Sequence, residues 1–231
     1  SDDQHSTSES PVIKYQTAIL ISILIFGCFF VFYGTKLRGD DVQQHYAYYS
    51  HGFERLLKLE LPNWNPYVSG GVPWQAEHHH PFSPLMFLTY LIHSDHFIAF
   101  HNVLMTIMAS LSVFLLSRRL KAPPIAAFVA AITYVGSGAM SYLFANGYSD
   151  HISGLAYIPL VSLMVLGLRE NPGLKWGLGT AFSIAAFVCS CHYQLVYYGI
   201  LWLACWFFFL LFSRTEQRAR VFVVCSLAVA A

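Results

Sequence analysis

Acidic residues and histidines gather in one polar stretch of an otherwise apolar sequence. It opens with two adjacent aspartates, Asp40 and Asp41, and later reaches Glu77, His78 and His80. A carboxylate pair suits general base catalysis or the binding of a divalent cation such as Mg²⁺ or Mn²⁺. The later group is a weaker metal candidate, because consecutive residues in an extended segment point apart. A structural role for the triplet His78-His79-His80 is therefore favoured.

The two aspartates also have a purely structural interpretation. They precede a helix predicted over Val42–Leu61, so either could cap its N-terminus without any catalytic role. Two aspartates exceed what one cap needs, which leaves one for a proton or a metal. Apolar side chains recur on this helix at three- and four-residue steps: Tyr46, Tyr49, Phe53 and Leu56 or Leu57. Such a face is typical of a helix that lies in the membrane interface.

Composition places these residues in a membrane protein. Hydrophobic residues make up 56% of the chain and charged residues 11%, and the mean hydropathy is +0.50. The apolar residues form runs of roughly 17–25, the length that crosses a bilayer. A formal net charge of +1 argues against nucleic acid as a partner. The sequence therefore predicts an all-α polytopic membrane protein with membrane lipids as its surroundings.

About six complete spans and a truncated seventh are expected. The predicted spans are Val12–Tyr33, Phe97–Leu116, Pro124–Phe144, Gly154–Leu168, Leu174–Ser190 and Leu195–Phe212, with a seventh that starts at Val221. Residues 1–11 are expected to be a disordered cytoplasmic segment, and residues 12–231 one transmembrane domain whose first outer loop covers about 35–95. Phe82–Ile92 is too short to span and is predicted to be re-entrant or interfacial.

The basic residues predict an orientation with the N-terminus in the cytoplasm. In that topology nine of the thirteen Lys and Arg residues lie inside, and every short inner loop is basic, as the positive-inside rule expects. All histidines except His5 then fall on the outer side or near the outer ends of spans. An outward-facing polar cavity, roofed by the first loop, would explain them, although a single histidine in the headgroup zone has little meaning. The five cysteines lie in apolar runs and are expected to be small buried side chains.

Four motifs in order resemble one family of bacterial membrane proteins. They are Asp40-Asp41-Val42-Gln43-Gln44, the loop from Pro62 to Pro73 with the Phe82-Ser83-Pro84-Leu85 segment, Asn146–His151, and Cys191–Tyr198. Their order and spacing resemble the YfhO-type proteins of the GT-C glycosyltransferase superfamily. The likeness covers residues 12–231 and is strongest in the first loop. Cys191 and Tyr193 replace the Gly and Pro of the family's Gly-His-Pro-Gln segment.

The resemblance implies a GT-C-like bundle that transfers a sugar, with inversion, from a polyprenyl-phosphate carrier to an outer-side acceptor. It implies a bacterial cytoplasmic membrane, with the first loop periplasmic or extracellular. Asp40 or Asp41 would be the catalytic base or hold the cation. The substrate-binding candidates are Arg38, Arg55, His151 and His192 for phosphate, and Gln44 and Gln194 for hydroxyl groups.

One departure from the family keeps other functions open. Members of the family are much longer, whereas this sequence ends inside an apolar run at Ala231. The domain is expected to be incomplete at this end, or the chain to be a reduced relative. The alternatives are a non-catalytic transmembrane subunit docked on other membrane subunits and a transporter. Transport is the least favoured, because no span carries a central charge and no inverted repeat is visible.

Overall fold

The computed structural model describes residues 40–60, 63–66, 70–73, 83–90, 97–171 and 173–212, and for residues 40–48, 89–90, 207 and 209–212 only the backbone. These residues are mostly helical. The helices are α2 (Asp40–Leu57), α3 (Pro84–Tyr90), α4 (Phe97–Arg119), α5 (Pro124–Val135), α6 (Gly138–Asn146), α7 (Ser149–Glu170), α8 (Leu174–Ser190) and α9 (Tyr193–Phe212). Two short strands, β1 (Trp64–Asn65) and β2 (Val72–Pro73), pair antiparallel. The predicted spans at Val12–Tyr33 and from Val221 lie outside the described residues, as do Cys28 and Cys225.

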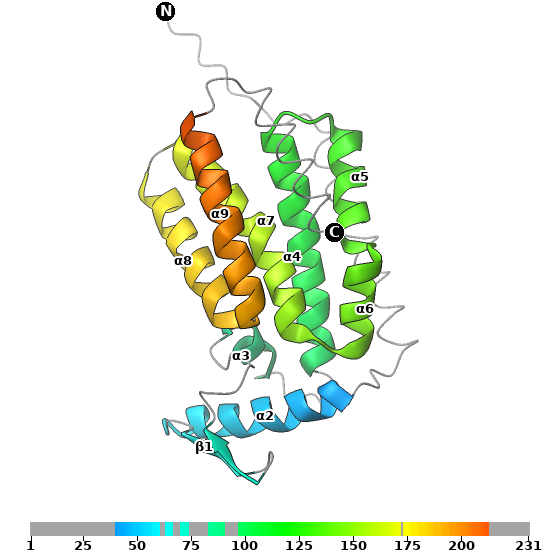
Figure 1. Cartoon of the computed structure of the whole chain (residues 1–231), viewed down its shortest axis with the longest axis vertical. Coiled ribbons are helices and arrows are strands. Elements are labelled where there is room, and N and C mark those ends of the chain that lie inside the picture. Colours follow the sequence, from blue (N-terminus) through cyan, green and yellow to red (C-terminus); the bar gives the residue numbers. More distant parts are fainter. Residues whose placement is uncertain are drawn as a thin grey trace, which may run out of the picture.

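The long helices run side by side, and α2 lies across one end of them (Figure 1). Helix α4 packs against α5 and α7, and α7 also packs against α8 and α9. The contacting faces carry small residues at four-residue steps, such as Ala109 between Met105 and Val113 on α4, and Ala127 and Ala131 on α5. Small side chains let the backbones of apolar helices approach closely. The core therefore sits along α4 and α7.

Two described helices, α4 and α7, are long and apolar enough to cross a membrane. Helices α5 and α6 would make a third span if the pair is counted as one, and α8 is a shorter apolar helix. The structure thus supports an all-α protein with two to three spanning helices. The six complete spans of the sequence analysis remain a prediction.

The predicted span Pro124–Phe144 is broken in the structure. Helices α5 and α6 meet at an angle of 42°. Helix α5 ends at Val135 with Gly136 as its C-cap, and the Ser137 hydroxyl accepts a hydrogen bond from the backbone N–H of Met140 at 3.3 Å, which caps α6. A Gly-Ser-Gly sequence favours such a break, because glycine is a poor helix former and serine a good N-cap.

A proline inside α7 is compensated by a neighbouring helix. Pro159 has no N–H, so the carbonyl oxygen of Leu155, four residues earlier, loses its helical hydrogen bond. The Tyr134 hydroxyl on α5 donates to that oxygen at 2.7 Å. A backbone acceptor within an apolar bundle needs such a partner, since no water is available to it. This bond ties α5 to α7.

Helix α2 is held against the bundle by its aromatic face. Tyr49 and Phe53 are buried and stack at 5.8 Å between ring centroids, and they pack with Met86, Phe97 and Ile98. The predicted spacing is thus confirmed for these two residues. The face contacts α3 and α4 of the protein itself, so protein covers it, and the position of α2 in the membrane interface stays a prediction.

The boundaries of α2 also differ from the predicted ones. It begins at Asp40, two residues before the predicted start, so Asp40 and Asp41 lie in its first turn rather than ahead of it. Leu56 is partly buried against the bundle, whereas Leu57 is 46% exposed. Of these two residues, Leu56 therefore belongs to the apolar face of α2. The short segment predicted over Phe82–Ile92 contains α3, a seven-residue helix.

The end of the bundle away from α2 is rich in basic residues, and an ion pair there joins α4 to α7. Arg119 Nε lies 2.6 Å from Glu170 Oε2, and the guanidinium stands over the Trp176 ring, 4.4 Å from its centroid. Gly167 provides the room for that ring, because a Cβ at Gly167 would come within 2.3 Å of it. Arg119, Glu170, Trp176 and Gly167 are called the closed end below.

Candidate functional site

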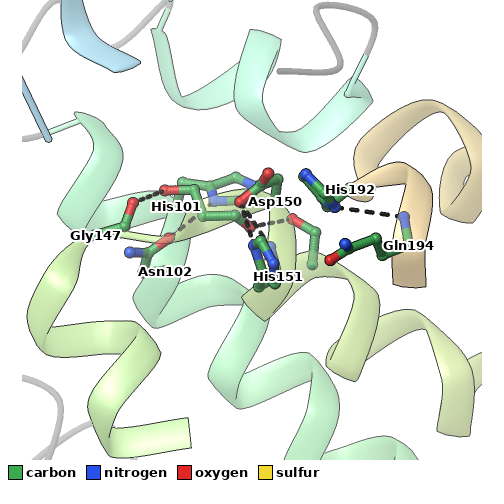
Figure 2. A network of polar contacts seen from close by, with 9 residues as sticks. His101, Asn102, Gly147, Asp150, His151, His192 and Gln194 are labelled. Carbon is green, nitrogen blue, oxygen red and sulfur yellow. Dashed lines mark hydrogen bonds and ion pairs between the residues drawn. The ribbon is translucent and has the colours of Figure 1, made fainter. Parts of the chain in front are cut away.

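Several of the described polar residues predicted to face outward lie at the end of the bundle that carries α2 (Figures 1 and 2). Three chain segments meet there: the start of α4, the α6–α7 connection and the α8–α9 connection. The residues His101, Asn102, Asp150, His151 and His192 are called the histidine cluster. Ordinary packing of apolar helices does not require these side chains, because buried polar groups are costly at membrane depth.

Asp150 and His151 lie in the first turn of α7. Helix α6 ends at Asn146, and its C-cap Gly147 has a φ of 77°, in the left-handed region that favours glycine; α7 starts at Ser149. Asp150 is 2% exposed, and its Oδ1 accepts hydrogen bonds from the backbone N–H of His151 at 2.9 Å and from His151 Nδ1 at 2.9 Å. An acidic side chain is favourable at a helix N-terminus. The sequence thus fixes the position of the carboxylate and, through it, of the imidazole.

His192 lies in the connection between α8 and α9. Its ring stacks on that of His151, with centroids 4.7 Å apart and an interplanar angle of 23°, and the Tyr193 ring lies 4.2 Å away. The backbone N–H of Gln194 donates to His192 Nδ1 at 3.3 Å. Burial, and to a lesser degree the Asp150 carboxylate, raise the pKa of the adjacent Cys191 thiol, so this cysteine is not an activated nucleophile.

The start of α4 adds two fully buried polar side chains. His101 Nδ1 lies 3.3 Å from Asn102 Oδ1, and His101 is close enough to Asp150 to interact with it electrostatically. His101 Nε2 and Asn102 Nδ2 are buried and have no hydrogen-bond partner in the described part of the chain. Most buried polar atoms in proteins have a partner, so these two indicate a further polar group at the site.

The structure brings together three of the predicted substrate-binding residues: His151, His192 and Gln194 (Figure 2). Arg55 is placed differently, since it is half exposed and forms an ion pair with Glu60 after the end of α2. Asp40, Asp41 and Gln44 lie in the first turns of α2, of which only the backbone is described. Arg38, Glu77, His78 and His80 lie outside the described residues.

Asp150, His101 and Asn102 were not proposed as site residues from the sequence. Asp150 and His101 were placed on the outer side without a role, and Asn102 was absorbed into an apolar span. The available signal was a His-Asn pair one turn inside that span, since such residues are rare at membrane depth unless they have a function.

The described residues contain no group of three or more His, Cys, Asp or Glu side chains that could hold a metal ion. The three described cysteines, Cys189, Cys191 and Cys205, are free. Cys191 is buried as expected, whereas Cys205 is exposed on α9, so the expectation of burial was wrong for Cys205. A pairing of Cys189 with Cys191 does not occur here.

No family model, curated protein or solved structure matches this chain. Fold and site therefore define its class by themselves. It is a mostly helical protein with two to three helices able to cross a membrane and a histidine cluster at one end of the bundle.

Proposed function

We propose that this chain is a GT-C-like membrane glycosyltransferase, or the N-terminal part of one, that moves a sugar from a polyprenyl-phosphate carrier to an acceptor. The observation that carries the proposal is the position of α2. This helix begins with Asp40-Asp41 and lies across the same end of the bundle as the histidine cluster (Figure 1). Carboxylates and imidazoles would then share one site at one side of the membrane.

The chemistry of the transfer needs such a group of side chains. The acceptor hydroxyl must lose a proton, and the departing phosphate must be stabilised by positive charge or by a metal ion. In this proposal Asp40 or Asp41 acts as the base or holds Mg²⁺ or Mn²⁺, as the resemblance implies. Arg38 is the stronger candidate for the phosphate, because the charge of Arg55 is already offset by Glu60.

The position of the proposed site also implies an orientation of the chain in the membrane. The short connections at the closed end carry Arg118, Arg119, Lys121, Arg169 and Lys175, whereas the histidine cluster lies at the opposite end. This distribution supports a cytoplasmic closed end and an outward-facing cluster under the positive-inside rule. The bacterial cytoplasmic membrane, the about six complete spans and the cytoplasmic N-terminus belong to the same proposal.

The test uses Asp40→Asn and Asp41→Asn separately in native membrane vesicles. The readout is loss of a labelled sugar from its polyprenyl-phosphate carrier. We expect one of the two variants to lower transfer by a factor of at least about 100, the typical contribution of a positioned base. Glu54→Gln is the matched control, because Glu54 is an exposed carboxylate on the same helix.

The outcome that overturns the proposal is unchanged transfer in both folded variants, or no transfer by the wild type. Co-purification of other subunits with an inactive wild type would favour a docked, non-catalytic subunit. Flux of a sugar across vesicles without transfer would favour a transporter.

A further inference from the structure

The hydrogen bonds of the histidine cluster define the tautomer of His151. Asp150 Oδ1 can only accept, so the nitrogen that faces it at 2.9 Å, Nδ1 of His151, carries the proton. The lone pair of the neutral ring is then on Nε2. A histidine whose Nδ1–H is held by a carboxylate is oriented as a proton acceptor, since the carboxylate stabilises the imidazolium that forms.

His192 has the opposite tautomer. The backbone N–H of Gln194 donates to Nδ1 of His192, so that nitrogen is unprotonated and Nε2 carries the hydrogen. The two stacked rings therefore differ in what they offer to a ligand. In these tautomers His151 Nε2 is a hydrogen-bond acceptor and His192 Nε2 a donor, and a hydroxyl group combines the two complementary functions.

Exposure separates the roles of Asp150 and His151. The Asp150 side chain is 2% exposed and cannot meet a ligand, whereas that of His151 is 27% exposed. Asp150 is thus a positioning residue, and His151 is the group a ligand would touch. The other titratable side chains around the pair are Tyr148, Cys191, Tyr193 and His101.

A hydroxyl fits this site better than a phosphate does. Among the described residues, no Lys or Arg belongs to the cluster, and the buried Asp150 carboxylate would repel an anion. His101 and Asn102 are as buried as Asp150 and, like it, do not contact the ligand directly.

We propose that Asp150, His151 and His192 form a binding site for a carbohydrate hydroxyl, in which His151 Nε2 takes the proton of that hydroxyl. The hydroxyl-binding part stands on the hydrogen bonds alone; the catalytic part rests on the proposed glycosyl transfer. In that step His151 is the base, which leaves Asp40 or Asp41 the cation-holding role that the proposed function also allows. The acceptor oxygen forms a bond to the anomeric carbon, and its proton moves to His151. The bond from that carbon to the phosphate oxygen breaks, and its electron pair leaves with the polyprenyl phosphate.

The first experiment reads the tautomers directly, by nitrogen NMR of the histidine-labelled protein in detergent. We expect the Nδ1–H form for His151 and the Nε2–H form for His192. Asp150→Ala removes the acceptor and should release His151 from the Nδ1–H form. His51 is an internal reference, because its Nε2 lies 3.1 Å from the Trp64 carbonyl oxygen, far from Asp150 in the sequence, and its signal should not change. An Nε2–H form for wild-type His151 overturns the proposal.

The second experiment compares two probes by the same spectra, methyl glucoside and inorganic phosphate. The glycoside should shift the signals of both His151 and His192, and phosphate should shift neither. His151→Gln should abolish the effect of the glycoside on His192. A response to phosphate alone, or to neither probe, overturns the hydroxyl site whether or not the wild type transfers sugar.

The third experiment measures transfer in vesicles for His151→Gln and Asp150→Ala. His151→Gln should lower kcat by a factor of about 100 or more, and Asp150→Ala should lower kcat with little change in KM. Full activity of His151→Gln overturns the proton-accepting role. An inactive wild type with the expected tautomers and glycoside response would overturn the catalytic role and the proposed function, while the binding site would be upheld.

Discussion

The two ends of the bundle use polar side chains in opposite ways. At the closed end, Arg119 is paired with Glu170 and covered by Trp176, so its charge is balanced within the fold. At the other end, the histidine cluster holds two buried atoms, His101 Nε2 and Asn102 Nδ2, without a partner among the described residues. Satisfied polar groups help to hold helices together, whereas unsatisfied ones cost stability. The closed end therefore serves the fold, and the unpartnered atoms at the other end favour the proposed ligand site.

The largest effect is expected from filling the space that the closed end leaves for Trp176. Gly167→Val places methyl groups where even a Cβ would lie 2.3 Å from the indole ring, so α7 and α8 must separate. Overpacking of this kind costs about 2–3 kcal/mol of unfolding free energy. Equilibrium unfolding in mixed detergent measures it.

Gly177→Ala is the control for that variant. A Cβ at Gly177 meets nothing within 4 Å, and alanine favours a helix by up to about 1 kcal/mol over glycine. The control should therefore be neutral or stabilising. An equal loss of stability in both variants would mean that the Trp176 contact does not hold α7 against α8.

A smaller loss is expected from Tyr134→Phe, which leaves the Leu155 carbonyl oxygen without its hydrogen bond. A buried acceptor that loses its partner costs about 1–2 kcal/mol. Pro159→Ala restores the helical N–H to that oxygen, so the loss should disappear when both substitutions are combined. Tyr142→Phe is the control, because Tyr142 is 61% exposed. Additive effects of the two substitutions would show that the tyrosine does not compensate for the proline.

Hydrophobic periodicity in the sequence predicted most of the helices in this fold. Apolar runs predicted α4, α7, α8 and α9 with boundaries that differ from the structure by at most about five residues, because each run is long and bounded by charged or turn residues. The break between α5 and α6 was missed, since an apolar run hides a short Gly-Ser-Gly interruption. The aromatic face of α2 was predicted, but a pattern on one helix does not say whether protein or lipid covers it.

The site was predictable only in part, for a different reason. His151, His192 and Gln194 were selected as polar residues near the outer ends of spans, and the fold does bring them together. The roles of Asp150 and His101 depend on contacts between helices distant in sequence. Periodicity carries no information about such contacts, and only the packing of α4, α7 and the α8–α9 connection reveals them.

A still smaller effect, of opposite sign, is expected from removing the unsatisfied atoms of the histidine cluster. The double variant His101→Leu with Asn102→Leu replaces two buried polar side chains by apolar ones. The change should be neutral or should stabilise the protein by up to about 1 kcal/mol, because no satisfied partner is lost. A destabilisation above about 1 kcal/mol would show that these atoms support the fold, and the contrast between the two ends would disappear.

The smallest effect is expected where the α2 end carries its own ion pair. The Glu60 side chain is half exposed, and the hydrogen bond and positive charge of Arg55 lower its pKa. A carboxyl with a lowered pKa stabilises the fold above its unfolded-state pKa, and this contribution is lost as the pH falls through the folded-state value. Solvent and salt screen the pair, however, so Glu60→Gln should leave the unfolding free energy unchanged within error at about 0.15 M salt. Arg119→Ala should cost about 1 kcal/mol by the same measurement, because that guanidinium is only 19% exposed and also loses its contact with Trp176. Equal effects of the two variants would mean that ion pairing contributes alike at both ends, and that the closed end is not specialised for holding the helices together.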